Sequence, residues 1–243
     1  MCMMSTLCSP HVDNVNIVPS KRPRRPAPRR AYHHGNLREA LIDAGLSHLE
    51  RDDADTLSLR DLARQTGVAA NAVYRHFESK EALQAALAAE GFRRLLAAQL
   101  AAAQANPSPR ETLLDSGRAY VRFAHSHPAL YRLMFGRYGA THRQGELGDA
   151  GTASFRELAR QVGAAFALKD TDERRGSSTV YVWALVHGLS ELWIDGQFDG
   201  LVPDPAALVE NVVHLAAALA PPMVTSVDTP RPPEKKASSR GSR

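Results

Sequence analysis

The sequence predicts an all-α protein built from two helical domains. Alanine and leucine dominate over β-branched residues, apolar residues recur at three- and four-residue steps, and serine or proline marks several helix starts. We expect an N-terminal three-helix domain containing a helix-turn-helix over residues 32–80, then a larger helical domain over residues 81–220. With 243 residues, 44% of them hydrophobic, the chain is long enough to bury a substantial core.

Four helices are expected in the first part of the chain, and three of them have a start signal. Asn36, Ser58 and Ser79 are side chains typical of N-caps, and Asp61 follows Ser58 at the spacing of a capping box. The acidic stretch RDDAD separates the first helix from the second. The expected ranges are 37–52, 58–65, 69–75 and 80–104.

The second and third helices are separated by the turn Gln65-Thr66-Gly67-Val68, which is typical of a helix-turn-helix with the third helix in the recognition position. On that third helix, Val73 and Phe77 are four residues apart and can pack on the preceding helices. The opposite side then stays free to lie in a DNA major groove, with cationic side chains beside it for the phosphates. These outward residues are Ala70, Asn71, Tyr74, His76 and Lys80.

Five further helices are expected in the second domain. Pro109 follows Ser108, and Glu111 stands at the capping-box position, which predicts a helix start. A glycine-rich loop is expected over residues 136–151. The expected helices are 109–127, 129–135, 152–168, 173–196 and 205–219.

The last two helices are the expected homodimer interface, because paired helices from two subunits form a four-helix bundle. An apolar stripe on residues 173–196 would form this interface, unless it belongs to the subunit's own core. The stripe consists of Val182, Leu185, Val186, Leu189 and Trp193.

A second stripe on the same helix, Trp183, His187 and Glu191, recurs at four-residue steps and can line an effector pocket. Other aromatic and histidine residues can line the same cavity. These are Tyr120, Phe123, His127, Tyr131 and Phe135. The alternative interpretation is that they are ordinary core aromatics and hydrogen-bonded histidines.

Both ends of the chain are basic and rich in proline or serine, which is typical of disordered segments. We expect a disordered leader with a basic arm over residues 1–31 and a disordered basic tail over residues 221–243. Residues 31–80 hold six basic and eight acidic residues, so the arm is expected to supply the attraction to nucleic acid. Its cations are Lys21, Arg22, Arg24, Arg25, Arg29 and Arg30.

Composition also argues against several classes of protein. No apolar run reaches the roughly 18 residues of a membrane span, and no signal peptide is evident, so the expected location is the cytoplasm. Cys2 and Cys8 both lie in the leader, which disfavours a disulfide scaffold or a zinc site. His125 and His127 point to different sides of a helix, so neither a metal nor a cofactor is expected.

The segments YHHGNLREALIDAGLSHLE and LSLRDLARQTGVAANAVYRHFESKEAL resemble the DNA-binding domain of the tetracycline-repressor (TetR) family of bacterial transcription regulators. The resemblance covers residues 32–83 and includes the Leu-Ala-x-x-x-Gly-Val turn, the Tyr-x-x-Phe helix end and the Ser-Lys-Glu-Ala-Leu start. AYVRFAHSHPALYRLMFG and VWALVHGLSELWIDGQF resemble a TetR C-terminal domain type marked by a Trp, a His and a Gly. Here these are Trp183, His187 and Gly188.

The resemblance implies a homodimer whose two recognition helices enter successive major grooves of a palindromic double-stranded operator. Base readout would fall to Ala70, Asn71 and Arg75, since asparagine can pair with adenine and an alanine methyl can touch thymine. Phosphate contacts would come from Thr56, Ser58, Tyr74, His76 and Lys80. Ala69 departs from the Ser or Thr that the family often has there, and lacks a cap worth about 1 kcal/mol.

The predicted function is therefore a ligand-responsive transcriptional regulator, most simply a repressor that a small-molecule effector releases from its operator. The alternative is an architectural DNA-binding protein without an effector, which a C-terminal core without a pocket would favour. An enzyme is not expected, because the sequence lacks a Gly-rich phosphate loop, a G-x-S-x-G elbow and an H-E-x-x-H pair.

Overall fold

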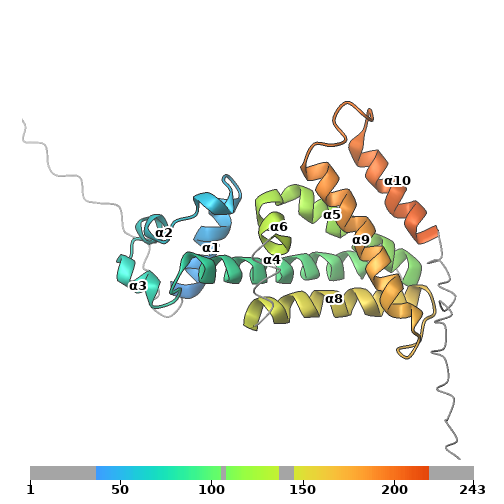
Figure 1. The fold of residues 1–243 in the computed structure, drawn as a ribbon, viewed down its shortest axis with the longest axis horizontal. Helices are drawn as coiled ribbons and strands as arrows, with labels where there is room; N and C mark the ends of the chain where they lie inside the picture. Colours follow the sequence, from blue (N-terminus) through green and yellow to red (C-terminus); the bar gives the residue numbers. More distant parts are fainter. Residues whose placement is uncertain (1–36, 105–107, 137–144, 219–243) are drawn as a thin grey trace, which may run out of the picture. The chain divides into compact units, whose positions relative to one another are not determined.

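The protein's computed structural model describes residues 37–104, 108–136 and 145–218, without the side chains of residues 215–218. Within these ranges the ordered backbone is helical and contains no strand, which confirms the all-α prediction (Figure 1). The leader with its basic arm, the cap Asn36 and the C-terminal tail lie outside the described residues. In the described part of the chain, no helix has both the length and the hydropathy needed to cross a bilayer.

The first helices surround the predicted helix-turn-helix. They are α1 (Leu37–Leu49), the 3-10 turn η1 (Ala54–Thr56), α2 (Leu59–Thr66), α3 (Ala70–Tyr74) and α4 (Lys80–Ala103). The remaining helices form the C-terminal bundle. They are α5 (Pro109–Ser126), α6 (Pro128–Phe135), α8 (Gly145–Ala165), α9 (Arg174–Ile194) and α10 (Pro205–Ala218).

Serine caps begin two of these helices as predicted. The Ser58 hydroxyl accepts a hydrogen bond from the Asp61 backbone N–H (3.4 Å), and the Ser79 hydroxyl accepts one from the backbone N–H three residues on (3.2 Å). Ser108 precedes α5, but its side chain makes no capping hydrogen bond, so the predicted capping box is not formed. Pro109 at the first position suffices there, because proline presets the helical φ and lacks the N–H that would need a partner.

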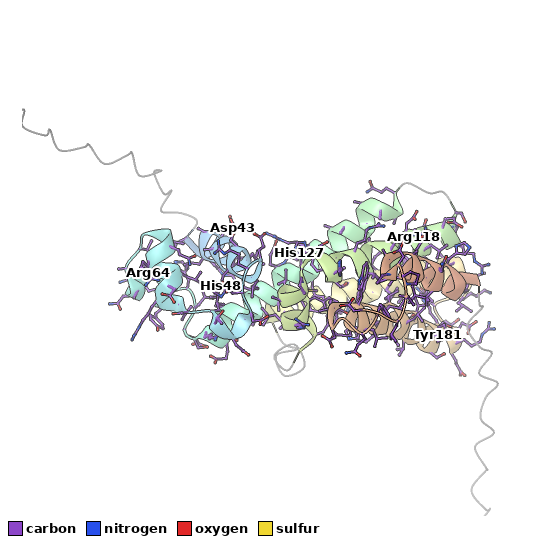
Figure 2. All side chains as sticks on the ribbon, turned by 90° about the horizontal axis from the view of Figure 1, so that it is seen from above. Asp43, His48, Arg64, Arg118, His127 and Tyr181 are labelled. Carbon is purple, nitrogen blue, oxygen red and sulfur yellow. The ribbon has the colours of Figure 1, made fainter. Side chains whose placement is uncertain are left out.

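The first helix is shorter than predicted, because the chain turns back at its end. α1 ends at Leu49, and residues 54–56 form η1 instead of an unstructured acidic break. The ring of His48, labelled in Figure 2, lies 2.8 Å from the Thr56 hydroxyl, measured from Nε2 to Oγ1. This contact holds η1 against the end of α1.

The glycine-rich stretch expected as a loop over residues 136–151 is largely helical where it is described. α8 begins at Gly145 and ends at Ala165, so both ends precede the predicted ones. Leu147 is buried, and a β-carbon at Gly151 would lie 3.8 Å from the ring of Phe92 on α4. Because α8 packs along α4, tertiary contacts override the weak helix propensity of glycine (Figure 1).

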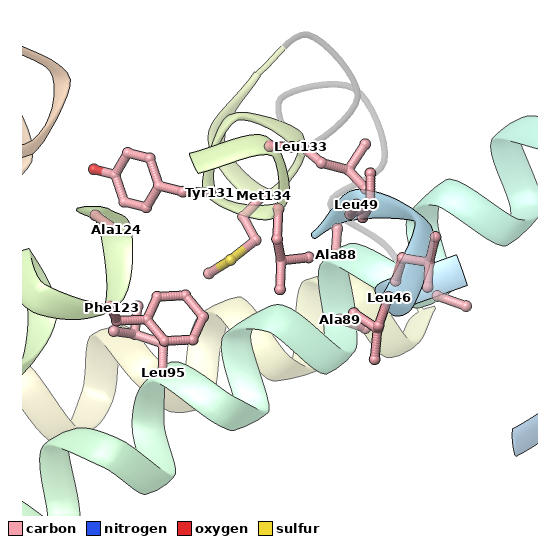
Figure 3. Close-up of a cluster of buried hydrophobic side chains, with 14 of the residues drawn as sticks. Leu46, Leu49, Ala88, Ala89, Leu95, Phe123, Ala124, Tyr131, Leu133 and Met134 are labelled. Atoms are coloured by element: carbon pink, nitrogen blue, oxygen red, sulfur yellow. The ribbon is translucent and has the colours of Figure 1, made fainter. Parts of the chain in front are cut away.

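A single hydrophobic cluster joins helices of both predicted domains. α4 packs against α1, α5, α6 and α8, and its small residue Ala88 lets the neighbouring helices come close. Figure 3 shows Leu46 and Leu49 of α1 near Leu133 and Met134 of α6 within this cluster. The N-terminal helices and the C-terminal bundle therefore share buried side chains.

The apolar stripe predicted for the dimer interface mostly faces the subunit's own interior. Val186 and Leu189 are buried, and Leu185 and Trp193 pack partly buried against the core cluster. The fifth member, Val182, lines a cavity. A different side of α9 is exposed and carries the large apolar side chains Tyr181 and Leu192.

Candidate DNA-binding face and ligand cavity

The turn between α2 and α3 depends on one left-handed residue. Gly67 has φ 72° and ψ 25°, and its backbone N–H donates to the carbonyl oxygens of Ala63 and Arg64, which ends α2. The Val68 N–H also donates to Ala63 O (3.0 Å). Glycine adopts positive φ without the steric cost of a β-carbon, so the chain can turn sharply into α3.

The short helix α3 has one buried and one exposed side, as the sequence predicts. Val73 and Phe77 are almost completely buried in the core cluster. Ala70 and Asn71 are exposed, and the Tyr74 side chain is 46% exposed. Val73 and Phe77 thus anchor α3 to the core and leave its other side open.

Lys80 and Thr56 are held at the edge of this face by η1. The Lys80 ammonium donates to the carbonyl oxygen of Asp55 (Nζ to O, 2.5 Å), and the Thr56 hydroxyl donates to Asp53 O (2.8 Å). Ser58 lies next to them as the cap of α2. The predicted phosphate-contacting side chains of this edge are therefore already oriented by the protein.

Gln84 fixes η1 to α4, a role that the sequence analysis missed. Its side chain is fully buried, and its amide Nε2 donates to Ala54 O (2.9 Å). The available signal was a glutamine at a core-facing position of α4, next to Leu83. Removing the amide would remove one of the two hydrogen bonds that Ala54 O accepts, at a cost of about 0.5–1.5 kcal/mol.

Cationic side chains flank the recognition helix. Arg75 and His76 are exposed directly after α3, and Arg60 is exposed in the first turn of α2. Arg64, labelled in Figure 2, forms an ion pair with Asp61 (2.7 Å), which neutralises part of its charge. The positive charge available to a polyanion is therefore modest within the described residues, as the sequence predicts for this domain.

The C-terminal helices surround a cavity of about 550 Å³, bounded by α4, α5, α6, α8 and α9. This volume falls within the roughly 300–1,000 Å³ typical of small-molecule sites. None of the described residues that line the cavity carries a formal charge. Its apolar walls include Phe92, Leu113, Met134, Phe135, Leu147 and Trp183.

The structure brings half of the predicted pocket residues to this cavity. The residues that line it are Tyr120, Phe135, Trp183 and His187. Tyr131 is fully buried and reaches His187 without lining the cavity. The remaining predicted residues, Phe123, His127 and Glu191, do not line it. The lining residues of α4 and α8, such as Phe92 and Leu147, were not predicted.

A three-membered hydrogen-bond cluster forms one wall of the cavity. Nδ1 of His187 lies 2.6 Å from the Tyr131 hydroxyl and 3.0 Å from the Tyr120 hydroxyl, and the two hydroxyls are 3.0 Å apart. Burial lowers the pKa of His187, and the negative charge of Glu191 opposes this shift. Burial raises the pKa of Tyr120 and of Tyr131. All three groups are therefore uncharged at neutral pH.

A second polar pair lies at the α4–α5 contact. The buried amide of Gln99 donates to the buried hydroxyl of Ser116 (3.1 Å), and both residues line the cavity. In the described ranges, no group of three His, Cys, Asp or Glu side chains is placed to hold a metal ion. The cavity therefore offers apolar surface and a few neutral polar groups.

The fold joins a helix-turn-helix, whose recognition helix is exposed, to a helical bundle that contains a ligand-sized cavity. This combination places the protein in the class of DNA-binding regulators. Comparison with known families agrees: the model for bacterial regulatory proteins of the tetR family matches residues 41–87, and the tetracyclin repressor-like C-terminal domain matches residues 113–216. The chain belongs to the tetR family of transcriptional regulators, which are DNA-binding proteins and not enzymes.

Individual relatives support the same assignment. Over 185 residues the chain is 29% identical to Rv0681, an HTH-type transcriptional regulator of Mycobacterium tuberculosis, covering 75% of this chain and 81% of the relative. A solved structure of a Rhodococcus sp. RHA1 protein of unknown function is 36% identical, with a TM-score of 0.66, over 78% of this chain and 96% of that one. A tetR-family transcriptional regulator from Streptomyces coelicolor shares the fold, with 20% identity and a TM-score of 0.57 over 74% and 78% of the two chains.

Proposed function

We propose that this regulator is a repressor that binds a palindromic operator as a homodimer and is released by a small-molecule effector. The proposal rests on one observation: α6 contacts both the cavity and the N-terminal helices. Its residues Met134 and Phe135 line the cavity, and the same helix packs against α1 and η1, which precede the helix-turn-helix in the chain. A ligand that displaces α6 would therefore press on the DNA-binding helices.

In this proposal the exposed side of α3 enters the major groove. Ala70, Asn71 and Arg75 read base edges, where the asparagine amide can bond adenine and the alanine methyl can touch thymine. The surrounding side chains contact the phosphates and set the position of α3 on the duplex. These are Thr56, Ser58, Tyr74, His76 and Lys80, with the basic arm of residues 21–30 adding attraction in the minor groove.

The partner subunit would cover the exposed side of α9. Tyr181 and Leu192 are exposed apolar side chains on that side, and exposed apolar surfaces mark protein interfaces. A β-carbon at Gly188 would meet no atom within 4 Å, so a second helix could approach there. A two-fold pairing of α9 and α10 would form a four-helix bundle and present two copies of α3 to DNA.

An effector shifts the regulator away from DNA only if it binds the DNA-incompetent state more tightly. A ligand present at 100 times its dissociation constant for that state stabilises it by about 2.7 kcal/mol. That lowers the apparent affinity for DNA by at most about 100-fold. The regulator acts on chromosomal DNA and so is proposed to work in the cytoplasm.

The proposal is tested by measuring affinity for the promoter DNA of the protein's own gene and for random DNA of equal length, at one fixed salt concentration. Specific binding is expected to be at least about 1,000-fold tighter. Equal affinity for both DNAs would overturn the proposal and favour the architectural alternative. The cavity does not favour that alternative, which needs a C-terminal core without a pocket.

A further inference from the structure

We propose that the effector is an uncharged, largely apolar molecule with one hydrogen-bond acceptor that binds the Nε2–H group of His187. The inference rests on the proposed function, because it names the ligand class of the same cavity. It is supported by the charge of the cavity wall, the hydrogen-bond pattern at His187 and the aromatic rings beside that residue.

The cavity wall is unsuited to an ion. None of its described lining residues carries a formal charge, and its buried Gln99 amide is already paired with Ser116. An ionised ligand group would lose its hydration without gaining an opposite charge, which is strongly unfavourable. An uncharged ligand avoids this cost and gains from the apolar surface around it.

The protonation state of His187 follows from counting donors and acceptors. The hydroxyls of Tyr120 and Tyr131 and Nδ1 of His187 all lie within 3.0 Å of one another. If Nδ1 accepts from Tyr131, Tyr120 can donate to Tyr131, and every proton in the cluster has an acceptor. If Nδ1 carried a proton, it could accept from neither hydroxyl, and one hydroxyl proton would have to point out of the cluster, toward Ser190. The arrangement with Nδ1 as acceptor pairs both hydroxyl protons within the cluster, and it places the proton of the neutral imidazole on Nε2.

The Nε2–H group then remains as a donor directed away from the tyrosines. Within the described residues no acceptor contacts it, and His187 lines the cavity. A ligand carbonyl or ether oxygen can supply the missing acceptor. The group is open to the cavity, so a ligand that carries such an oxygen can take the place of water there.

Aromatic rings beside His187 favour a flat ligand body. The Phe135 and Trp183 ring centroids lie 4.8 Å and 5.7 Å from that of His187, and the Phe155 ring lies 6.1 Å from Trp183. All four residues line the cavity. A planar aromatic or conjugated ligand can stack or pack edge-on against these rings.

Charge selectivity is tested with two fluorescent probes that differ by one sulfonate. N-phenyl-1-naphthylamine is uncharged, and 8-anilinonaphthalene-1-sulfonate is its anionic counterpart. The uncharged probe is expected to bind at least about 100-fold more tightly to the full chain. Equal affinities would overturn the proposed ligand class. Leu158→Trp, which fills the cavity, should abolish binding of the uncharged probe; binding that persists would show that the cavity is not the site.

The acceptor is tested with Prodan, an uncharged naphthyl ketone whose emission moves to longer wavelength when its carbonyl accepts a hydrogen bond. His187→Phe is expected to weaken Prodan binding about tenfold and to remove the red shift. N-phenyl-1-naphthylamine, which has no carbonyl, should bind this variant within about twofold of the original affinity. His187→Gln keeps a donor and should retain the red shift. Prodan binding and emission unchanged by His187→Phe would overturn the role of Nε2–H.

Binding of the probes is measured without DNA, so these outcomes do not depend on repression. A separate experiment adds each bound probe to the operator complex. If the operator stays bound in the presence of every probe that occupies the cavity, the proposed effector response is wrong, but the ligand class is not affected. If the probes do not bind the protein, the proposed ligand class is wrong.

Discussion

Gly91 of α4 lies directly against Met134 of α6: a β-carbon built at position 91 would be 2.6 Å from Met134 Sδ and 3.1 Å from Leu130 Cδ1. Met134 is 1% exposed, so its side chain cannot move into solvent. Because glycine at position 91 has no side chain, α6 can approach α4 this closely. Since α6 also lines the cavity and packs on α1, this contact positions both functional regions.

We predict that Gly91→Ala destabilises the protein by up to about 2 kcal/mol. Overpacking a buried contact typically costs about 1–3 kcal/mol, and alanine recovers about 1 kcal/mol through its better helix propensity. The measurement is the urea midpoint at constant m value. Gly176→Ala in α9 is the control, because a β-carbon there meets nothing within 4 Å and should be neutral or slightly stabilising. Equal effects of the two substitutions would contradict the assignment of a tight α4–α6 contact.

Features that depend on neighbouring residues were predictable from the sequence, and features that depend on distant contacts were not. Ser58 and Ser79 cap their helices as predicted, because a cap bonds to an amide three residues away. The start of α8 was placed too late, because the helicity of this glycine-rich segment depends on packing of Leu147 and Gly151 against another helix.

The candidate site shows the same division. The inward residues Val73 and Phe77 of α3 followed from their spacing, since a short helix with one apolar side has one orientation. α9 is apolar on more than one side, so periodicity alone did not show that Val186 faces the core and Leu192 the surface. In the cavity, Phe92 is indistinguishable in sequence from a core phenylalanine, because both are apolar residues on the inner side of a helix.

The buried His187 should make stability depend on pH in the acidic range. Burial lowers the pKa of His187 in the folded protein, while Glu191 on the same helix opposes this, and the facing Tyr120 and Tyr131 are uncharged. Between the folded pKa and the unfolded value of about 6.5, the unfolded chain binds more protons. Stability is therefore expected to fall as pH decreases below about 6.5.

This prediction is checked by urea unfolding of the original protein and His187→Gln at several values between pH 5 and pH 8. The variant should lose part of the pH dependence, because glutamine does not titrate. A His187→Gln profile parallel to that of the original protein would contradict the prediction.

Asn71 and Lys80 are expected to affect DNA binding in different ways. Asn71→Ala should reduce discrimination at one operator base pair by about 1–3 kcal/mol and leave nonspecific binding unchanged. Lys80→Ala should weaken binding to all sequences and reduce the salt dependence by about one phosphate contact. The measurement is operator affinity against a set of single-base operator variants at several salt concentrations. Loss of specificity in Lys80→Ala, with a normal salt slope, would contradict this division of roles.

The exposed side of α9 gives the test of the homodimer. Leu192 is 45% exposed within the subunit, and an aspartate there would become a buried, unpaired charge if a partner covers this side. Leu192→Asp is therefore expected to raise the dimer dissociation constant more than about 100-fold, measured by sedimentation velocity over a range of concentrations. Leu201→Asp makes the same chemical change at a residue that is 77% exposed and lies between α9 and α10, and it should leave the dimer intact. Leu192→Asp alone should also lower operator affinity, because two recognition helices must bind the operator together. If the two variants sediment identically, the dimer interface lies elsewhere.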